Sequence, residues 1–125
     1  MMLIPFDAHP ERLPGGSGRI GRYLSRAEAM AVLNMRSAHR AVVGGGPGPE
    51  GNVTKLVMSE MGHEAAAIAA SLGGPETAYA DGAGAITAWS ILMHRGMSIA
   101  GGTSEIKRNQ IGERILGLPR DPLIN

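Results

Sequence analysis

The sequence predicts an all-α protein, folded as an antiparallel bundle of two long and two shorter helices. Of its 125 residues, 43% are hydrophobic and only 3% are aromatic, and eight are Met, so its core is aliphatic. A core rich in Ala, Leu and Met favours packed helices over sheets, which use more β-branched and aromatic residues. Apolar residues also recur every three or four positions through two long segments, and Gly/Pro clusters separate these segments. The length suits one domain.

The first 43 residues predict an arm followed by a long helix. Residues 1–18 contain three prolines and the run Gly15-Gly16-Ser17-Gly18, which is typical of an irregular arm. Residues 19–43 have helical spacing, and the cluster from Gly44 to Pro49 ends that helix. Its predicted inward stripe is Ile20, Leu24, Ala27, Ala31, Ala38 and Val42, widened by Tyr23, Met30 and Met35.

Three more helices are expected in the remaining bundle domain, which extends over residues 19–125. The second covers residues 50–72 and stops at Gly73-Gly74. Its stripe is Val53, Leu56, Val57, Met61, Ala65, Ile68 and Leu72. A third covers 86–97, and we expect it to point Trp89, Leu92 and Met93 inward. The last covers 103–116, where Gly117 can take a left-handed conformation and Pro119 follows.

The two long helices carry more apolar surface than they can bury on each other and on two short helices. Apolar surface left exposed usually meets another subunit. We therefore expect a homo- or hetero-oligomer, or a fragment of a larger protein.

Composition and charge exclude several classes of function. Twelve basic and eleven acidic residues give a net charge of +1, which argues against a nucleic-acid partner. No stretch approaches the roughly 18 apolar residues of a membrane span, and the apolar residues 1–6 are too few for a signal peptide. The chain has no Cys, which fits a reducing compartment. We expect a cytoplasmic protein without a membrane span.

Three short motifs are tested against known chemistry. The stretch "GPGPEGNVTK", Gly46 to Lys55, lacks the Lys that directly follows the last glycine of a phosphate loop, so we interpret it as a helix–helix turn. His63-Glu64 opens like a zinc-protease helix, but Ala67 stands where a second His is needed, and we expect no metal site. No Gly-x-Ser-x-Gly elbow is present, and spacing alone leaves a hydrolase triad open.

The stretch Gly101-Gly102-Thr103-Ser104-Glu105 combines a tight loop with a helix start. Two glycines allow close backbone approach, Thr103 is a suitable N-cap, and Glu105 complements the helix dipole. The N–H groups of such a helix start can bind a phosphate, carbonyl or hydroxyl group. From these residues alone, a capped helix after a loop and a ligand-binding corner both remain open.

The longer run "IAGGTSEIKRNQIGERILGLPR" resembles the C-terminal signature of the acyl-CoA dehydrogenase family of flavoproteins. The upstream segments "RAEAMAVLNMRSAHRAV" and "GPGPEGNVTKLVMSEMGHEAA" resemble the same helical domain in the same order. The resemblance covers most of residues 19–120 and is greatest to the bacterial branch with a Gly-Gly-Thr-Ser-Glu motif.

The resemblance implies roles for the residues of this motif. Thr103, Ser104 and Glu105 would line FAD, and Gly101 and Gly102 would lie beside the acyl-CoA substrate. In the family a carboxylate removes the α-proton of the thioester while the β-hydrogen leaves as hydride to the flavin. Hydrogen bonds to the thioester oxygen then stabilise the enolate-like charge.

The sequence departs from the family pattern in three respects. Many members have their catalytic Glu directly before the Gly-Thr pair, where this chain has Gly101, so no residue is predicted as the catalytic base. An N-terminal helical domain, a central β domain and the first helix of the C-terminal bundle have no counterpart in the chain. The family's Gln-x-x-Gly-Gly flavin motif is not evident before the last helix either.

The function that the resemblance implies is FAD-dependent oxidation of an acyl-CoA to the 2,3-enoyl-CoA, a reaction of fatty acid metabolism. We expect the chain to contribute to it as part of a larger protein or assembly and to be inactive alone. The alternative is a non-catalytic helical assembly module that pairs with a full-length dehydrogenase.

Overall fold

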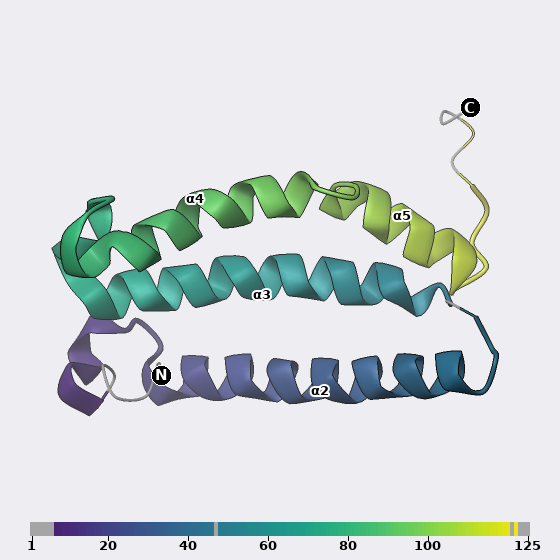
Figure 1. The fold of residues 1–125 in the computed structure, drawn as a ribbon, viewed down its shortest axis with the longest axis horizontal. Helices are drawn as coiled ribbons and strands as arrows, with labels where there is room; N and C mark the ends of the chain where they lie inside the picture. Colours follow the sequence, from purple (N-terminus) through teal and green to yellow (C-terminus); the bar gives the residue numbers. More distant parts are fainter. Residues whose placement is uncertain (1–6, 47, 121, 123–125) are drawn as a thin grey trace.

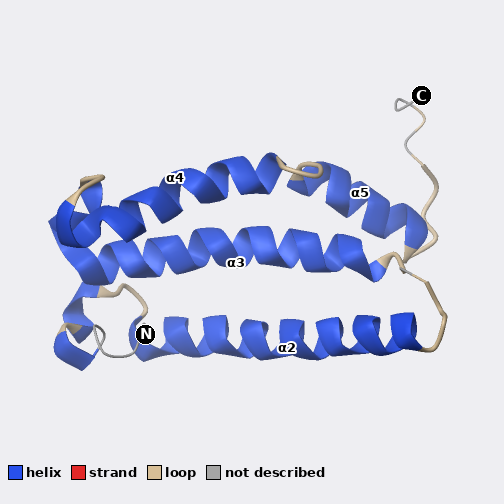
Figure 2. Ribbon diagram, in the orientation of Figure 1, coloured by secondary structure: helices blue, strands red, loops and turns tan. Residues whose placement is uncertain are grey.

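Four α-helices lie side by side in a single layer (Figure 1). The structure is a computed structural model and describes residues 7–46, 48–120 and 122. Their regular elements are η1 (Pro10–Arg12), α2 (Gly16–Val42), α3 (Glu50–Gly73), η2 (Gly74–Ala78), η3 (Gly82–Gly84), α4 (Ala85–Ile99) and α5 (Ser104–Arg114). In this described part all regular structure is helical, which confirms the predicted all-α class (Figure 2). No helix within it is both long enough and apolar enough to cross a membrane.

The middle of the layer is α3, which lies between α2 on one side and α4 with α5 on the other (Figure 1). Helix α2 runs antiparallel to α3, and α4 and α5 follow one another along its opposite side. Three residues of the predicted α3 stripe, Met61, Ile68 and Leu72, are buried. Ile68 has no exposed surface at all. With Ala66, helix α3 therefore supplies four of the eight buried hydrophobic residues of the described part, more than any other element.

The segment before the first long helix is more ordered than the irregular arm predicted over residues 1–18. Residues 1–6 of that arm lie outside the described residues, but 10–12 form η1 and α2 already begins at Gly16. Leu13 is only 3% exposed and packs with Ile20, Ile68 and Leu72, partly covered by Tyr23. The prediction failed here because Leu13 closes the end of the core between α2 and α3, a contact that proline and glycine content does not reveal.

The inward face of α2 is rotated relative to the predicted stripe. Ile20 and Met30 are buried as expected, whereas Leu24, Met35 and Val42 are 46%, 71% and 85% exposed. Tyr23 and Ala27 of the predicted stripe are half-buried beside them, and the stripe continues through half-buried Leu33 and Ser37, which were not predicted. Periodicity alone did not separate two adjacent apolar stripes on one helix.

Helix α4 leaves Trp89, Leu92 and Met93 exposed, which contradicts the inward position expected for them. These residues are 57%, 64% and 56% exposed. The face of α4 toward α3 carries Ala88, which is buried, and Thr87, Ile91 and Ser98, which are half-buried. On α3, a Cβ at Gly62 would collide with the His94 ring of α4. The two helices approach too closely there for Trp or Met to fit between them.

Ion pairs join α3 to α2 and α5. Glu60 of α3 contacts Arg26 of α2 at 3.3 Å and Arg108 of α5 at 2.9 Å, so one carboxylate links three helices. Arg19 donates from Nε to Glu64 at 2.6 Å. These contacts are consistent with the rotation of α2, whose arginines Arg19 and Arg26 face the glutamates of α3.

The Arg19–Glu64 pair predicts a loss of stability in acid. The hydrogen bond from Arg19 holds the pKa of Glu64 below its ordinary value, against the opposing effect of burial. A lowered folded-state pKa stabilises the protein above the unfolded-state pKa of about 4.3, and this contribution is lost as the pH falls through the folded value. Between about pH 6 and about pH 3, the urea midpoint of the native chain should fall more than that of Glu64→Gln. Equal falls in the two proteins would contradict the assignment.

Gly84 predicts a second effect on stability. A Cβ at this buried position would overlap the backbone of Glu76 and Thr77. Gly84→Ala should lower the free energy of unfolding by about 1–3 kcal/mol, measured by urea denaturation. The matched control is Gly21→Ala, at an exposed position in the second turn of α2 with open space around its Cβ. It should raise stability by up to about 1 kcal/mol, and a loss at Gly21 would overturn the comparison.

Candidate functional site

The predicted site lies at the corner where α4 ends and α5 begins. Gly101 and Gly102 have φ values of 70° and 106°, a region that favours glycine. The Gly102 N–H donates to the carbonyl of Ile99 at 3.0 Å and closes the turn. The chain thereby leaves α4 and restarts as α5 along the same side of α3 (Figure 1).

Thr103 caps α5, as the sequence predicts. Its backbone is extended, and its Oγ1 accepts a hydrogen bond from the N–H of Ile106 at 3.4 Å. Glu105 folds back over the same helix start. Its own backbone N–H and then the Thr103 hydroxyl hold the pKa of Glu105 below its ordinary value. The carboxylate is therefore ionised at neutral pH. It and the Thr103 hydroxyl both interact with donors in the first turn of α5.

The five predicted site residues form one outward-facing corner. Gly101 and Glu105 are exposed, and Gly102, Thr103 and Ser104 are half-buried. A Cβ at Gly101 would meet nothing within 4 Å, so space is open at this position. The corner thus presents backbone groups, two hydroxyls and one carboxylate to whatever lies beside it.

Two lysines tie the corner to α3. The Nζ of Lys55 donates to the carbonyls of Met97 at 3.2 Å and Ser98 at 2.8 Å, at the end of α4. It also donates to the Oγ of buried Ser59 at 3.0 Å. On α5, the Nζ of Lys107 donates to Oδ1 of Asn52, which lies on α3, at 3.2 Å. The charge of Lys55 suits the negative end of the α4 dipole.

Neither lysine was among the site residues predicted from the sequence. The available signal was a single Lys55 inside the apolar run of residues 53–58, four positions before Ser59. A cation at that place on the inner face of a helix needs acceptors from a neighbouring element. The partner was not predictable, because it lies 43 residues further along the chain.

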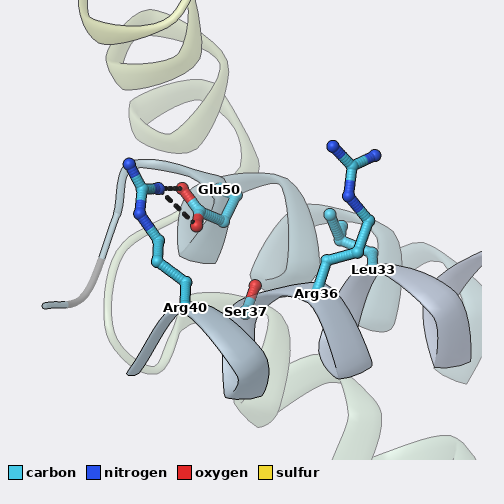
Figure 3. A pocket seen from close by; sticks show the side chains of 5 residues that line it. All are labelled: Leu33, Arg36, Ser37, Arg40 and Glu50. Atoms are coloured by element: carbon cyan, nitrogen blue, oxygen red, sulfur yellow. Dashed lines mark hydrogen bonds and ion pairs between the residues drawn. The ribbon is translucent and has the colours of Figure 1, made fainter. Parts of the chain in front are cut away.

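Away from this corner, a hollow of about 450 Å³ lies at the turn between α2 and α3. It is lined by Leu33, Arg36, Ser37, Arg40 and Glu50 (Figure 3). Arg40 donates from Nη1 to both carboxylate oxygens of Glu50, at 2.8 and 3.0 Å. The backbone N–H of Glu50 and then Arg40 lower the pKa of this carboxyl group. Helix α2 ends at Val42 and α3 begins at Glu50, so the stretch that was compared with a phosphate loop lies at a helix–helix connection and contributes its residues 50–55 to α3. It places a carboxylate, not a phosphate-binding lysine, at the start of α3. This confirms the helix–helix turn.

The histidines form no metal site among the described residues. His63 and His94 pack edge to face with ring centroids 6.2 Å apart. No group of three or more His, Cys, Asp or Glu residues in the described ranges could hold a metal ion.

The fold and corner define a helical domain that ends in a capped Gly-Gly-Thr-Ser-Glu motif. The model of the family "Acyl-CoA dehydrogenase, C-terminal domain" matches residues 6–116, so the chain belongs to the acyl-CoA dehydrogenase family through that domain. The chain is 34% identical over 105 residues to acyl-CoA dehydrogenase FadE34 of Mycobacterium tuberculosis. The match covers 82% of this chain but only 14% of that relative. No solved structure matches the chain.

The Lys55 tether predicts a local effect on the corner. Lys55→Met retains most of the side-chain volume but removes the donor to two α4 carbonyls, so it should cost about 1–2 kcal/mol of stability. It should also speed hydrogen exchange at the amides of residues 99–102. Lys107→Met is the comparison, because it removes a contact of α5 and leaves the end of α4 held. Unchanged exchange at residues 99–102 in Lys55→Met would show that the tether does not position the corner.

Proposed function

We propose that this chain supplies the flavin-facing corner of an FAD-dependent acyl-CoA dehydrogenase, which oxidises an acyl-CoA thioester to the 2,3-enoyl-CoA. The observation that carries the proposal is the capped Gly101–Glu105 corner at the end of a domain of this family. The rest of the catalytic centre belongs to a larger protein or assembly. Because the chain spans 14% of its matched relative, the activity of that whole is part of the proposal.

The residues of the corner fit a flavin dinucleotide in their chemistry. FAD presents hydroxyls, phosphate oxygens and ring nitrogens, which need both donors and acceptors. Thr103 and Ser104 offer hydroxyls that can act as either, and the side chain of Glu105 is 78% exposed and can accept from a ribityl or ribose hydroxyl. The same carboxylate would repel a phosphate, so we place the hydroxyl-bearing part of FAD, rather than its diphosphate, beside Glu105.

Gly101 and Gly102 would hold the substrate beside the flavin. Without Cβ atoms they let a thioester approach the backbone, and an N–H at this turn can donate to the thioester oxygen. That N–H is the Gly101 group, because the Gly102 N–H is already bonded to Ile99. FAD, when bound, supplies the hydride acceptor.

The corner has no base at the position that we assign to the substrate, because Gly101 has no side chain. Glu105 is assigned to the flavin, and its lowered pKa makes its carboxylate a poor proton acceptor. The base therefore comes from another part of the assembly, and the chain alone is inactive. We place this assembly in the cytoplasm, in keeping with a chain that has no cysteine.

A second candidate function is a non-catalytic helical module that pairs with a full-length dehydrogenase. Two observations favour it: the missing carboxylate at Gly101 and the large apolar side chains exposed on α2 and α4. In that case FAD would be held without the Gly101–Glu105 corner.

The proposal predicts that the purified chain, given acyl-CoAs, FAD and an artificial electron acceptor, shows no turnover, because the base is absent. Robust turnover would contradict inactivity. For the active assembly, the chain should be isolated with its native partners through an affinity tag, and bound flavin measured by absorbance.

Variants of the corner separate the two candidates in that assembly. Ser104→Ala combined with Glu105→Gln should lower the flavin content and enoyl-CoA formation if the corner holds FAD. The control Glu113→Gln, near the end of α5, should leave both unchanged. Full flavin content in the double variant would favour the assembly module.

A further inference from the structure

The hollow at the turn between α2 and α3 gathers positive charge. Arg36 and Arg40 are four residues apart on α2, so their side chains lie on the same face of that helix. Both line the hollow, and Figure 3 shows them on either side of Ser37. Helix α3 begins at Glu50 and adds the positive end of its dipole at the same place.

Glu50 is an anion that already occupies part of this hollow. Its two carboxylate oxygens accept from Nη1 of Arg40 at 2.8 and 3.0 Å. The backbone N–H of Glu50, then Arg40 and, to a smaller extent, Arg36 hold the pKa of this carboxyl group below its ordinary value. The carboxylate therefore shows which charge the hollow favours and which donors it offers.

One guanidinium of the hollow is not used by Glu50. Among the described residues Arg36 has no ion-pair partner, and Figure 3 shows its tip well apart from the Glu50 carboxylate. Two arginines and one glutamate leave the lining with one excess positive charge. A phosphate monoester carries about −1.5 to −2 at pH 7, so it matches the two guanidinium groups better than a single carboxylate does.

The backbone of the turn leaves room for an anion on Arg40. A Cβ at Gly48 would collide with the carboxylate of Glu50 and with Nη1 of Arg40, and a Cβ at Gly45 would collide with the stem of Arg40. Neither of these glycines has a positive φ, so the space around Arg40, rather than the backbone conformation, requires glycine there. The turn is therefore shaped around Arg40 and the anion that it holds.

The space at this turn is larger than a carboxylate or a phosphate group alone needs. Its volume of about 450 Å³ lies in the range of about 300–1,000 Å³ that is typical of small-molecule sites. A neighbouring hollow of about 390 Å³ shares Ser37 and Glu50 with it and is also lined by Asn34 and Thr54. Amide and hydroxyl groups of this kind can hydrogen-bond the hydroxyls of a sugar.

From these observations we infer that the hollow between α2 and α3 binds the phosphate group of a small sugar phosphate through Arg36, Arg40 and Ser37, in exchange for the carboxylate of Glu50. Guanidinium groups suit phosphate because their forked N–H donors match its oxygens. The binding groups are side chains of α2 and not a phosphate loop. The site does not depend on flavin binding at the Gly101–Glu105 corner.

A titration of the full chain tests the ligand. Ribose 5-phosphate should shift the amide NMR signals of Gly48 and Gly51 in a saturable way, with a Kd below about 10 mM. Inorganic phosphate should bind more weakly, because it lacks the sugar. Acetate should not saturate the same signals, because a single carboxylate gains nothing over Glu50. Equal affinities for ribose 5-phosphate and either of the other two anions would overturn the sugar phosphate as the ligand.

Charge variants test the site. Arg36→Gln should weaken the binding of ribose 5-phosphate about tenfold, because a charge-assisted hydrogen bond is lost. The matched control is Arg22→Gln, which removes the same charge from an exposed position of α2 beside Gly15 and Gly18. It should change the affinity by less than about twofold, because exposed charges beyond about 10 Å are screened.

Glu50→Gln should act in the opposite direction and strengthen binding by at least about threefold, because a competing like charge leaves Arg40. A gain of affinity cannot arise from a variant that fails to fold. Equal losses in Arg36→Gln and Arg22→Gln would show attraction by net charge alone and would overturn the site. The absence of saturable shifts in both the native chain and Glu50→Gln would overturn it as well.

Discussion

The packing of α2 and α4 against opposite sides of α3 is the interaction on which the other features of this domain depend. Within the described residues, α3 alone has neighbours along both sides, and Ile68 in its C-terminal half is completely buried. Burying one such side chain contributes about 1.5–3 kcal/mol, so the stability of this small core depends on a few side chains. The ion pairs of Glu60 and Glu64 add contacts from α3 to α2 and α5. The layer has one central helix, and every other helix takes its orientation from it.

Close contact between α3 and α4 determines where the large side chains of α4 can go. Gly62 on α3 lies against the His94 ring of α4 without room for a Cβ. Trp89, Leu92 and Met93 are left exposed, and of the large apolar residues in the middle of α4 only Ile91 is half-buried. Where α4 ends, Lys55 of α3 donates to its last carbonyls. The packing of α4 on α3 thus determines both which of its apolar residues are exposed and where the Gly101–Gly102 turn lies.

Local features of this chain were predictable from sequence, and contacts between distant segments were not. The helices, the breaks at Gly44–Pro49 and Gly73-Gly74, and the Thr103 cap follow from periodicity, glycine and hydroxyl placement within a few residues. The direction of Trp89 does not, because it depends on Gly62, which is 27 residues away. The choice between the two stripes of α2 likewise depends on glutamates in α3. In the corner, the capping residues were identified from their own turn, whereas Lys55 was missed because its acceptors lie on another helix.

The end and the side of α4 carry different chemistry. Beyond its end, Gly101 has no side chain and open space around it, so the corner presents backbone groups there. Along its side, Trp89, Leu92 and Met93 are exposed, and none of them is titratable. If the corner meets a flavin as we propose, the base that removes the α-proton comes from another part of the assembly, because neither the Gly101 backbone nor these apolar side chains can supply it.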